Sequence, residues 1–164
     1  EHFNFIPDIL VLAKGLGGGM PIGCFISSKD NMNMFRKSPV LGHITTFGGH
    51  PVCCAAALAN MEFILNSKLI EEVRTKEQIL KAKLNHPKIK ALRSFGLMMA
   101  LEFDSFERNM EIIKACLKRG LITDWFLYAD QCLRIAPPLT INKDELAEAC
   151  KIITESIEEV YSPI

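Results

Sequence analysis

Residues 9–23 read ILVLAKGLGGGMPIG, an apolar run that ends at Lys14 and enters a segment rich in glycine. Four of the five residues after Lys14 are glycines, and a second apolar run, Cys24 to Ile26, follows Gly23. Short apolar runs bounded by glycine and proline are typical of strands joined by a turn. We therefore predict a strand, a glycine-dense turn beginning at Lys14, and a second strand.

Lys14 is the first candidate for chemistry because of where this pattern places its amine. A lysine at the end of a buried strand can be desolvated, which lowers the pKa of the amine and suits it as a Schiff-base nucleophile or general base. The alternative is a lysine whose amine merely reaches solvent from the strand end. Two phosphate-binding patterns do not fit this segment. The glycines lack the GxGxxG spacing of a dinucleotide-binding loop, and the lysine of a P-loop follows its glycines, whereas Lys14 precedes them.

The composition is that of an ordinary globular protein, with 49% hydrophobic and 23% charged residues among 164. Nineteen Lys and Arg residues balance nineteen Asp and Glu residues, so no net positive field attracts nucleic acid or an anionic membrane. The longest apolar runs, Ile9 to Ala13 and Pro51 to Ala59, are shorter than the roughly 20 residues of a transmembrane helix. We therefore expect no nucleic-acid partner and no membrane.

The cysteines and histidines show no pattern of a metal site. Six cysteines are scattered without a CxxC pair, and the four histidines have no metal-ligand spacing with them. Buried, reduced thiols in a cytoplasmic protein are the simpler interpretation. We predict no metal and a cytoplasmic location.

The composition and the hydrophobic pattern of the chain change near residue 66, which predicts two domains, residues 1–66 and 67–164. Eight of the ten glycines lie in the first 49 positions, whereas amphipathic helices and short apolar strands alternate after Asn66. The segment that follows Pro51 is apolar on every side, so we expect a buried helix there. The predicted fold class is α/β in the first part and α+β in the second.

Several local signals organise the second part. An apolar stripe predicts a helix from Leu69 to Leu84, with Lys76 on its polar side. Gly120 stands where a left-handed helix end belongs, and Asn142 with Glu145 resembles a capping box. Three aromatic residues could line a pocket, although a place in the core is our interpretation of them: Trp125, Phe126 and Tyr128.

Two further stretches contain candidate binding residues. Residues 45–51 read TTFGGHP, and their hydroxyls, glycines and following helix N-terminus offer donors to an anion such as phosphate, although an ordinary helix cap is the alternative. Arg134 lies within the apolar segment LRIAPPLTI, residues 133–141. Its planar fork matches a carboxylate, and the alternative is an outward-facing arginine on an edge strand.

The three stretches together resemble the landmarks of one family, in the family's order. PDI at 7–9 with AKGLGGGMPIG at 13–23 resembles the cofactor-lysine segment of class III aminotransferases, the pyridoxal-phosphate enzymes that include ornithine, acetylornithine, lysine and 4-aminobutyrate aminotransferases. TFGG at 46–49 with Pro51 resembles the next landmark, and LRIAPPLTI the last. The resemblance implies the C-terminal part of a type I pyridoxal-phosphate-dependent transferase fold, in which residues 1–66 end the large domain and residues 67–164 form the small α+β domain.

By this resemblance, each of the three candidate residues has a role. Lys14 would hold pyridoxal phosphate as a Schiff base and move a proton between the substrate and the cofactor. Thr46 would contact the cofactor phosphate across the interface of a homodimer, and Arg134 would bind the carboxylate of an amino acid or 2-oxo acid. The implied reaction transfers an amino group, from a terminal amine as in ornithine or lysine, to a 2-oxo acid. A decarboxylase or an aminomutase is a neighbouring possibility on the same scaffold.

The chain also departs from the family pattern. His50 replaces the usual Asn after the two glycines, and His43 and Ile44 replace small residues. The family's upstream phosphate loop, ring-stacking aromatic residue and acidic partner of the pyridine nitrogen have no counterpart among the thirteen residues before Lys14. We therefore expect a fragment without appreciable transaminase activity on its own. The alternative is a non-catalytic remnant or interaction module that keeps the fold.

Overall fold

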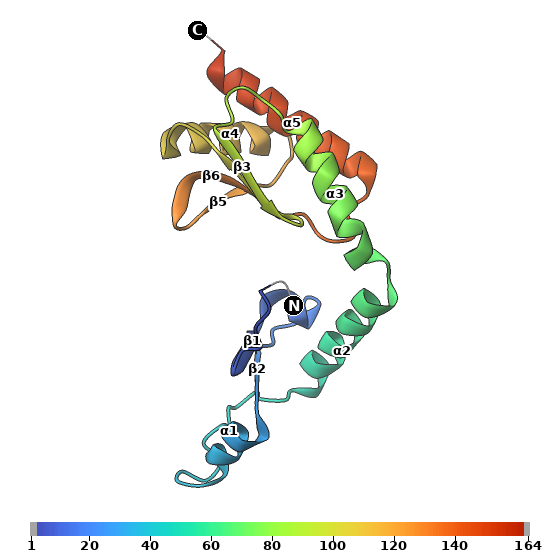
Figure 1. Ribbon diagram of the computed structural model, residues 1–164, viewed down its shortest axis with the longest axis vertical. Coiled ribbons are helices and arrows are strands. Elements are labelled where there is room, and N and C mark those ends of the chain that lie inside the picture. The colour runs from blue at the N-terminus through green and yellow to red at the C-terminus, as the bar shows by residue number, and fades with distance from the viewer. Residues whose placement is uncertain (1–2, 163–164) are drawn as a thin grey trace. The chain divides into compact units, whose positions relative to one another are not determined.

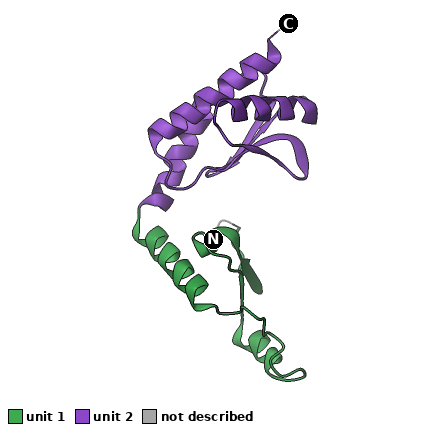
Figure 2. Cartoon of the chain, turned by 180° about the vertical axis from the view of Figure 1, so that it is seen from behind, with its two compact units in different colours: residues 1–67 green, residues 68–164 purple. Residues whose placement is uncertain are grey.

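The computed structural model describes residues 3–162 and contains two compact units that divide after Ser67 (Figure 1, Figure 2). Unit 1 holds the glycine-rich segment, and unit 2 holds the amphipathic helices and most of the strands. The domain boundary expected from the sequence, between residues 66 and 67, lies one residue earlier in the chain. Each unit is described by itself.

Unit 1 is built around the strand, turn and strand predicted from residues 9–23. β1 (Ile9–Leu12) pairs antiparallel with β2 (Cys24–Ser27), and a 3₁₀ turn (Lys14–Gly17) follows β1. Gly18 ends this turn at φ 57°, and a Cβ there would lie 2.9 Å from the Asn60 Cβ. Glycine is therefore required at this position by both the backbone conformation and the close approach of a helix.

The remaining elements of unit 1 are helical. α1 (Lys29–Asn33) is capped by Ser28, whose hydroxyl accepts a hydrogen bond from the Asn31 N–H at 3.2 Å. A short 3₁₀ turn (Met34–Arg36) follows, and a loop leads to α2 (Pro51–Asn66), which has proline in its first turn as predicted. α2 packs against the Lys14–Gly17 turn, because the Asn60 amide donates to the Gly15 carbonyl at 2.8 Å.

The expectation that α2 is buried is wrong for this chain. Of its apolar residues only Cys53 and Ala57 are buried, and Cys54 on the same helix is exposed, against the expectation of buried thiols. A helix that is apolar on all sides needs apolar neighbours on all sides. The described elements of unit 1 cover only part of it, so large side chains remain exposed, namely Val52, Leu58, Met61, Phe63 and Leu65.

Unit 2 contains a four-stranded antiparallel sheet with three helices packed on one face (Figure 1). The strands are β3 (Ala91–Phe95), β4 (Met98–Glu102), β5 (Asp124–Phe126) and β6 (Ala129–Ile135), arranged in the order β3-β4-β6-β5. The helices are α3 (Leu69–Lys83), α4 (Phe106–Lys118) and α5 (Lys143–Tyr161). β6 is therefore an inner strand, bordered by β4 and β5.

The core of unit 2 lies between the helices and one face of the sheet. Side chains of a strand alternate between the two faces of the sheet. The buried residues Met99 and Leu101 of β4 lie opposite the buried residues Ile135 and Leu133 of β6. The helices add the other buried side chains of this core, which include Leu80, Ile112, Cys116, Leu146, Cys150, Ile153 and Ile157. Burial raises the pKa of the Cys150 thiol to about 11, so it stays protonated.

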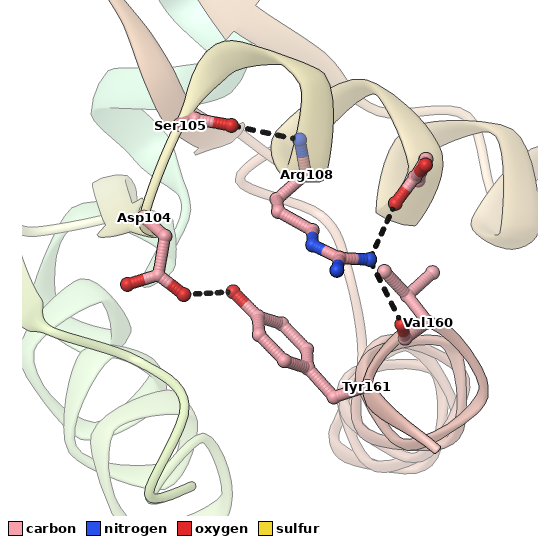
Figure 3. A network of polar contacts seen from close by, with 6 residues as sticks. Asp104, Ser105, Arg108, Val160 and Tyr161 are labelled. Atoms are coloured by element: carbon pink, nitrogen blue, oxygen red, sulfur yellow. Dashed lines mark hydrogen bonds and ion pairs between the residues drawn. The ribbon is translucent and has the colours of Figure 1, made fainter. Parts of the chain in front are cut away.

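The ends of the last two helices are fixed as the local signals predicted. Gly120 follows α4 at φ 85°, and Asn142 forms the predicted capping box with Glu145 at the start of α5. At the other end of α5, the Tyr161 hydroxyl donates to Asp104 at 2.9 Å, and Arg108 of α4 donates to the Val160 carbonyl at 3.2 Å (Figure 3). These two hydrogen bonds connect the C-terminal end of α5 to the start of α4 and to Asp104, which precedes that helix.

Lys76 lies in the interior of unit 2, and its expected place on the polar side of α3 is wrong. Only 5% of the residue is exposed. Its ammonium donates to the Leu139 carbonyl at 2.6 Å and pairs with Glu72 at 3.1 Å. The charge can be buried because both contacts replace water. Lys76 therefore attaches α3 to the loop that follows β6.

Replacing Lys76 with methionine is expected to destabilise the protein by roughly 1–3 kcal/mol, because the Leu139 carbonyl loses its partner in a partly buried place. The measurement is the free energy of unfolding in denaturant. Lys81→Met is the matched control, since Lys81 also pairs with a glutamate four residues away but is about half exposed. Its loss should change stability by less than about 0.5 kcal/mol. Equal losses in the two variants would contradict the assigned role of Lys76.

Among the described residues, no single helix is both long and apolar enough to cross a membrane. Only when α2 and α3 are counted together, across the break between them, do their length and composition meet that requirement.

Candidate functional site

Lys14 is presented at the end of β1 with its backbone in the left-handed region. Its φ is 54°, a conformation that non-glycine residues seldom adopt and that costs about 1 kcal/mol. The residue is exposed, and its amine makes no hydrogen bond or ion pair with the described residues. Gly15, the next residue, and Gly19, further along the glycine-rich segment, have no heavy atom within 4 Å of an added Cβ. The turn thus exposes an unpaired lysine amine on a segment whose backbone a ligand can approach.

Thr46 lies in a loop that turns sharply into the N-terminus of α2. The Gly48 N–H donates to the Thr45 carbonyl at 3.2 Å, and the His50 N–H donates to the Phe47 carbonyl at 3.2 Å. An added Cβ at Gly48 would lie 2.8 Å from the Thr45 hydroxyl oxygen, so a larger residue there would force the Thr45 side chain to move. His50 precedes the helix without a side-chain cap, which leaves the first N–H groups of α2 available to an anion.

Arg134 lies on the inner strand β6, which excludes the edge-strand alternative. The Arg134 Nη2 lies 2.5 Å from the Asp124 Oδ2 on β5, directly opposite in the register. The Asp124 Oδ1 in turn accepts the Trp125 N–H at 2.8 Å. The side chains of Arg134 and Asp124 are 41% and 46% exposed, on the face of the sheet opposite the three helices. The arginine is therefore both paired and accessible.

A row of opposed residues crosses the sheet through Arg134. The row consists of Arg93 on β3, Ala100 on β4, Arg134 on β6 and Asp124 on β5. Successive side chains of a row lie on the same face of a sheet, so two arginines flank the small Ala100. They line a cavity of about 470 Å³ together with Phe126, Leu127, Tyr128, Ala129 and Cys132.

Arg93 is held by two neighbours on this face. Its Nη1 donates to Glu102 at 2.6 Å, and its Nη2 donates to the Cys132 Sγ at 3.3 Å. The hydrogen bond from Arg93 lowers the pKa of the Glu102 carboxyl, and burial raises the pKa of the Cys132 thiol. Glu102 is thus charged and Cys132 neutral near pH 7, so the charge of Arg93 is balanced by Glu102.

The structure places Lys14 and Thr46 in unit 1 and Arg134 in unit 2. The expected core role is wrong for Tyr128, which is 98% exposed and lines the cavity with the partly buried Phe126. Asp124 was not predicted as a site residue. Residues 121–128 show no clear helical or strand periodicity, and neither segment's sequence predicts that β5 pairs with β6. No group of three or more potential metal ligands occurs within residues 3–162.

A sequence model of the family "Aminotransferase class-III" matches residues 1–157. The chain belongs to this family. It is 35% identical over 160 residues to the acetylornithine aminotransferase of Haemophilus ducreyi, covering 98% of this chain and 39% of that protein. It is 37% identical over 158 residues to the putrescine aminotransferase of Pectobacterium atrosepticum, covering 92% of this chain and 34% of that protein. The class III chain thus spans between about one third and two fifths of the length of these relatives.

Solved structures of the family share the fold. An ornithine aminotransferase from Toxoplasma gondii, with PLP at partial occupancy in its active site, matches with a TM-score of 0.84 and 29% identity, over 97% of this chain and 38% of that one. The PMP-bound form of an aminotransferase from Vibrio fluvialis matches with a TM-score of 0.82 and 26% identity, over 98% and 39%. The predicted fold class, part of a pyridoxal-phosphate-dependent transferase fold, is confirmed.

Proposed function

We propose that this class III chain is the C-terminal part of a pyridoxal-phosphate-dependent aminotransferase that moves a terminal amino group to a 2-oxo acid. Residues 1–66 would end its large domain and residues 67–164 would form its small domain. The observation that carries the proposal is Lys14, an unpaired amine on a strained glycine-rich turn in a chain that matches the family over residues 1–157. The exposed apolar surface of α2 supports a larger parent protein, because such a helix is stable only when covered.

The residues of unit 1 fit pyridoxal phosphate, a group with one aldehyde and one phosphate. The Lys14 amine matches the aldehyde, and the Thr46 hydroxyl with the free N–H groups of α2 suits the phosphate. When bound, the cofactor supplies an electron sink for the substrate carbon that loses a proton. Lys14 would bind this group, and its amine would then accept that proton and return it at the next step.

Arg134 would orient the second substrate of the reaction. Its Nε and Nη1 have no hydrogen-bond partner among the described residues, so these donors are available for a carboxylate. We further propose a homodimer in which Thr46 serves the phosphate bound in the partner subunit. The named relatives act on acetylornithine, ornithine and putrescine, which supports a donor with a terminal amine.

The test uses the whole protein that contains this chain, purified and mixed with pyridoxal phosphate. Borohydride reduction and peptide mapping should place one pyridoxyl group on Lys14, and terminal amines should yield glutamate from 2-oxoglutarate. Release of carbon dioxide without glutamate would point to a decarboxylase instead. Failure to take up the cofactor would support the alternative of a non-catalytic module.

Replacing Thr46 with valine is expected to weaken cofactor binding roughly tenfold or more, because a hydrogen bond to a charged group contributes about 1.5–3 kcal/mol. Valine keeps the shape of threonine and removes only the hydroxyl. The measurement is the dissociation constant of pyridoxal phosphate, obtained from its visible absorbance. Thr75→Val, at an exposed position on α3, is the control and should leave the constant unchanged. An unchanged constant in the Thr46 variant would exclude the phosphate contact.

A further inference from the structure

His50 stands directly before the first turn of α2, at the position that usually caps a helix. The preferred capping residues are Ser, Thr, Asp and Asn, because their side-chain oxygen accepts a hydrogen bond from the first N–H groups. The His50 side chain makes no such bond, and its ring lies beside that of Phe47, with centroids 6.4 Å apart. Within residues 3–162, neither ring nitrogen of this exposed residue has a hydrogen-bond or ion-pair partner.

The loop brings His50 close to Thr46, the residue assigned to the cofactor phosphate. The His50 N–H donates to the Phe47 carbonyl at 3.2 Å, which folds the chain back so that Thr46 and His50 flank the two glycines between them. Gly49 has φ 69°, and an added Cβ there would meet no heavy atom within 4 Å. A ligand can therefore approach this backbone between a hydroxyl and an imidazole.

This part of unit 1 carries an excess of positive charge. Residues 31–61 contain neither aspartate nor glutamate, and the first turn of α2 has no acidic residue. The same stretch contains four side chains that are cationic or can become so: Arg36, Lys37, His43 and His50. The N-terminus of a helix adds a partial positive charge. A protonated histidine at this end of α2 is therefore unfavourable unless an anion binds beside it.

We propose that His50 is a second phosphate-binding residue of the cofactor site. The protonated imidazole donates an N–H to one phosphate oxygen, while the Thr46 hydroxyl and the first N–H groups of α2 donate to the others. Because Thr46 and His50 belong to one loop, they serve the same phosphate. This inference rests on the proposed function, in which Thr46 and the N-terminus of α2 bind the phosphate of pyridoxal phosphate.

The residue type at position 50 decides what this contact contributes. An asparagine, the residue usual in the family at this position, is neutral and suits a helix cap. His50 makes no cap and offers a charge instead. A hydrogen bond between two charged groups is about twice as strong as one between neutral groups, and a phosphate monoester carries close to two negative charges near pH 7. The histidine therefore increases affinity for the phosphate end of the cofactor.

The experiment compares two ligands in the whole protein, pyridoxal phosphate and pyridoxal, which keeps the aldehyde and lacks the phosphate. Their dissociation constants are obtained from visible absorbance and require no turnover. In His50→Asn, the constant for pyridoxal phosphate should rise roughly tenfold, because a charge-assisted hydrogen bond is lost. The constant for pyridoxal should change less than about twofold, because this ligand has no group for His50 to bind.

The stability of the same variant separates ligand binding from a structural role. Asparagine is a preferred helix cap, so the free energy of unfolding of His50→Asn without cofactor should stay equal or increase. Weaker binding at equal or higher stability assigns His50 to the ligand. An equal loss of affinity for pyridoxal and pyridoxal phosphate would overturn the inference, since a structural change acts on both ligands.

His43→Asn is the matched control for the loss of an imidazole. His43 is an exposed histidine of the same loop, and its ring packs on Phe35 with centroids 6.2 Å apart. Both dissociation constants should stay within about twofold of the wild type. A weakening equal to that in His50→Asn would show a general effect of positive charge in residues 31–61, and it would overturn the direct contact.

The same measurements distinguish a failure of this inference from a failure of the proposed function. If the wild-type protein takes up neither aldehyde on Lys14, the proposed function fails and the His50 contact fails with it. If pyridoxal phosphate binds to Lys14 and its dissociation constant is unchanged in His50→Asn, the His50 contact fails alone.

Discussion

Replacing Lys14 with alanine is expected to lower amino transfer by the whole protein more than about a thousandfold. Alanine removes the amine that would bind the cofactor and the base that would move the substrate proton, so two roles are lost with one side chain. The measurement is the rate of glutamate formation from a terminal-amine donor and 2-oxoglutarate. Peptide mapping after borohydride should also find no pyridoxyl group in this variant.

Two controls distinguish the chemistry of Lys14 from its structural surroundings. Lys29→Ala removes an exposed lysine of α1 in the same unit and should leave the rate within about twofold. Added methylamine should partly restore the rate of Lys14→Ala, since a free amine can replace the missing base but not a missing fold. A Lys14→Ala variant that retains a tenth or more of the wild-type rate would contradict the assignment.

Unit 1 was predictable around Lys14 because its signals are local. The apolar run, the four glycines and Pro21 specify strand, turn and strand within 19 residues, 9 to 27, and the structure has each in place. Gly120 and the Asn142 capping box were predictable for the same reason, since a helix end is decided by residues within one turn. Such features depend on neighbours in the sequence.

The features that the sequence did not predict depend on distant partners. Lys76 is buried because its ammonium meets a carbonyl 63 residues away, and no spacing within α3 indicates this contact. The exposure of α2 likewise depends on which surfaces surround it, while the sequence reports only that all of its sides are apolar. Composition therefore predicts what a segment tends to bury, and the packing decides whether it does.

The site shows the same division between local and distant information. Arg134 was recognisable from the apolar strand and the PP pair that follow the family pattern, and its inner position follows only from the order β3-β4-β6-β5. Asp124 was missed because its significance lies in the register that sets it opposite Arg134. Pairing across strands brings a charge of each sign together at this point of the sheet.

Replacing Arg134 with glutamine should lower kcat/KM for 2-oxoglutarate roughly 10- to 150-fold, because a hydrogen-bonded charge on the carboxylate is worth about 1.5–3 kcal/mol. Arg134→Lys keeps the positive charge but not the planar guanidinium, so kcat/KM for 2-oxoglutarate should fall less than in Arg134→Gln. The loss should appear mainly in KM, since the carboxylate is bound equally in the ground state and the transition state.

The control for Arg134 is Arg108→Gln, which removes an arginine from α4 that contacts Val160 and Glu111 away from the sheet face (Figure 3). It should leave KM for 2-oxoglutarate unchanged while lowering stability slightly. The free energy of unfolding of Arg134→Gln should stay within about 1 kcal/mol of the wild type, because both side chains of its pair with Asp124 are more than two fifths exposed. A rise in KM at constant stability assigns Arg134 to the substrate, and an unchanged KM would place the carboxylate elsewhere.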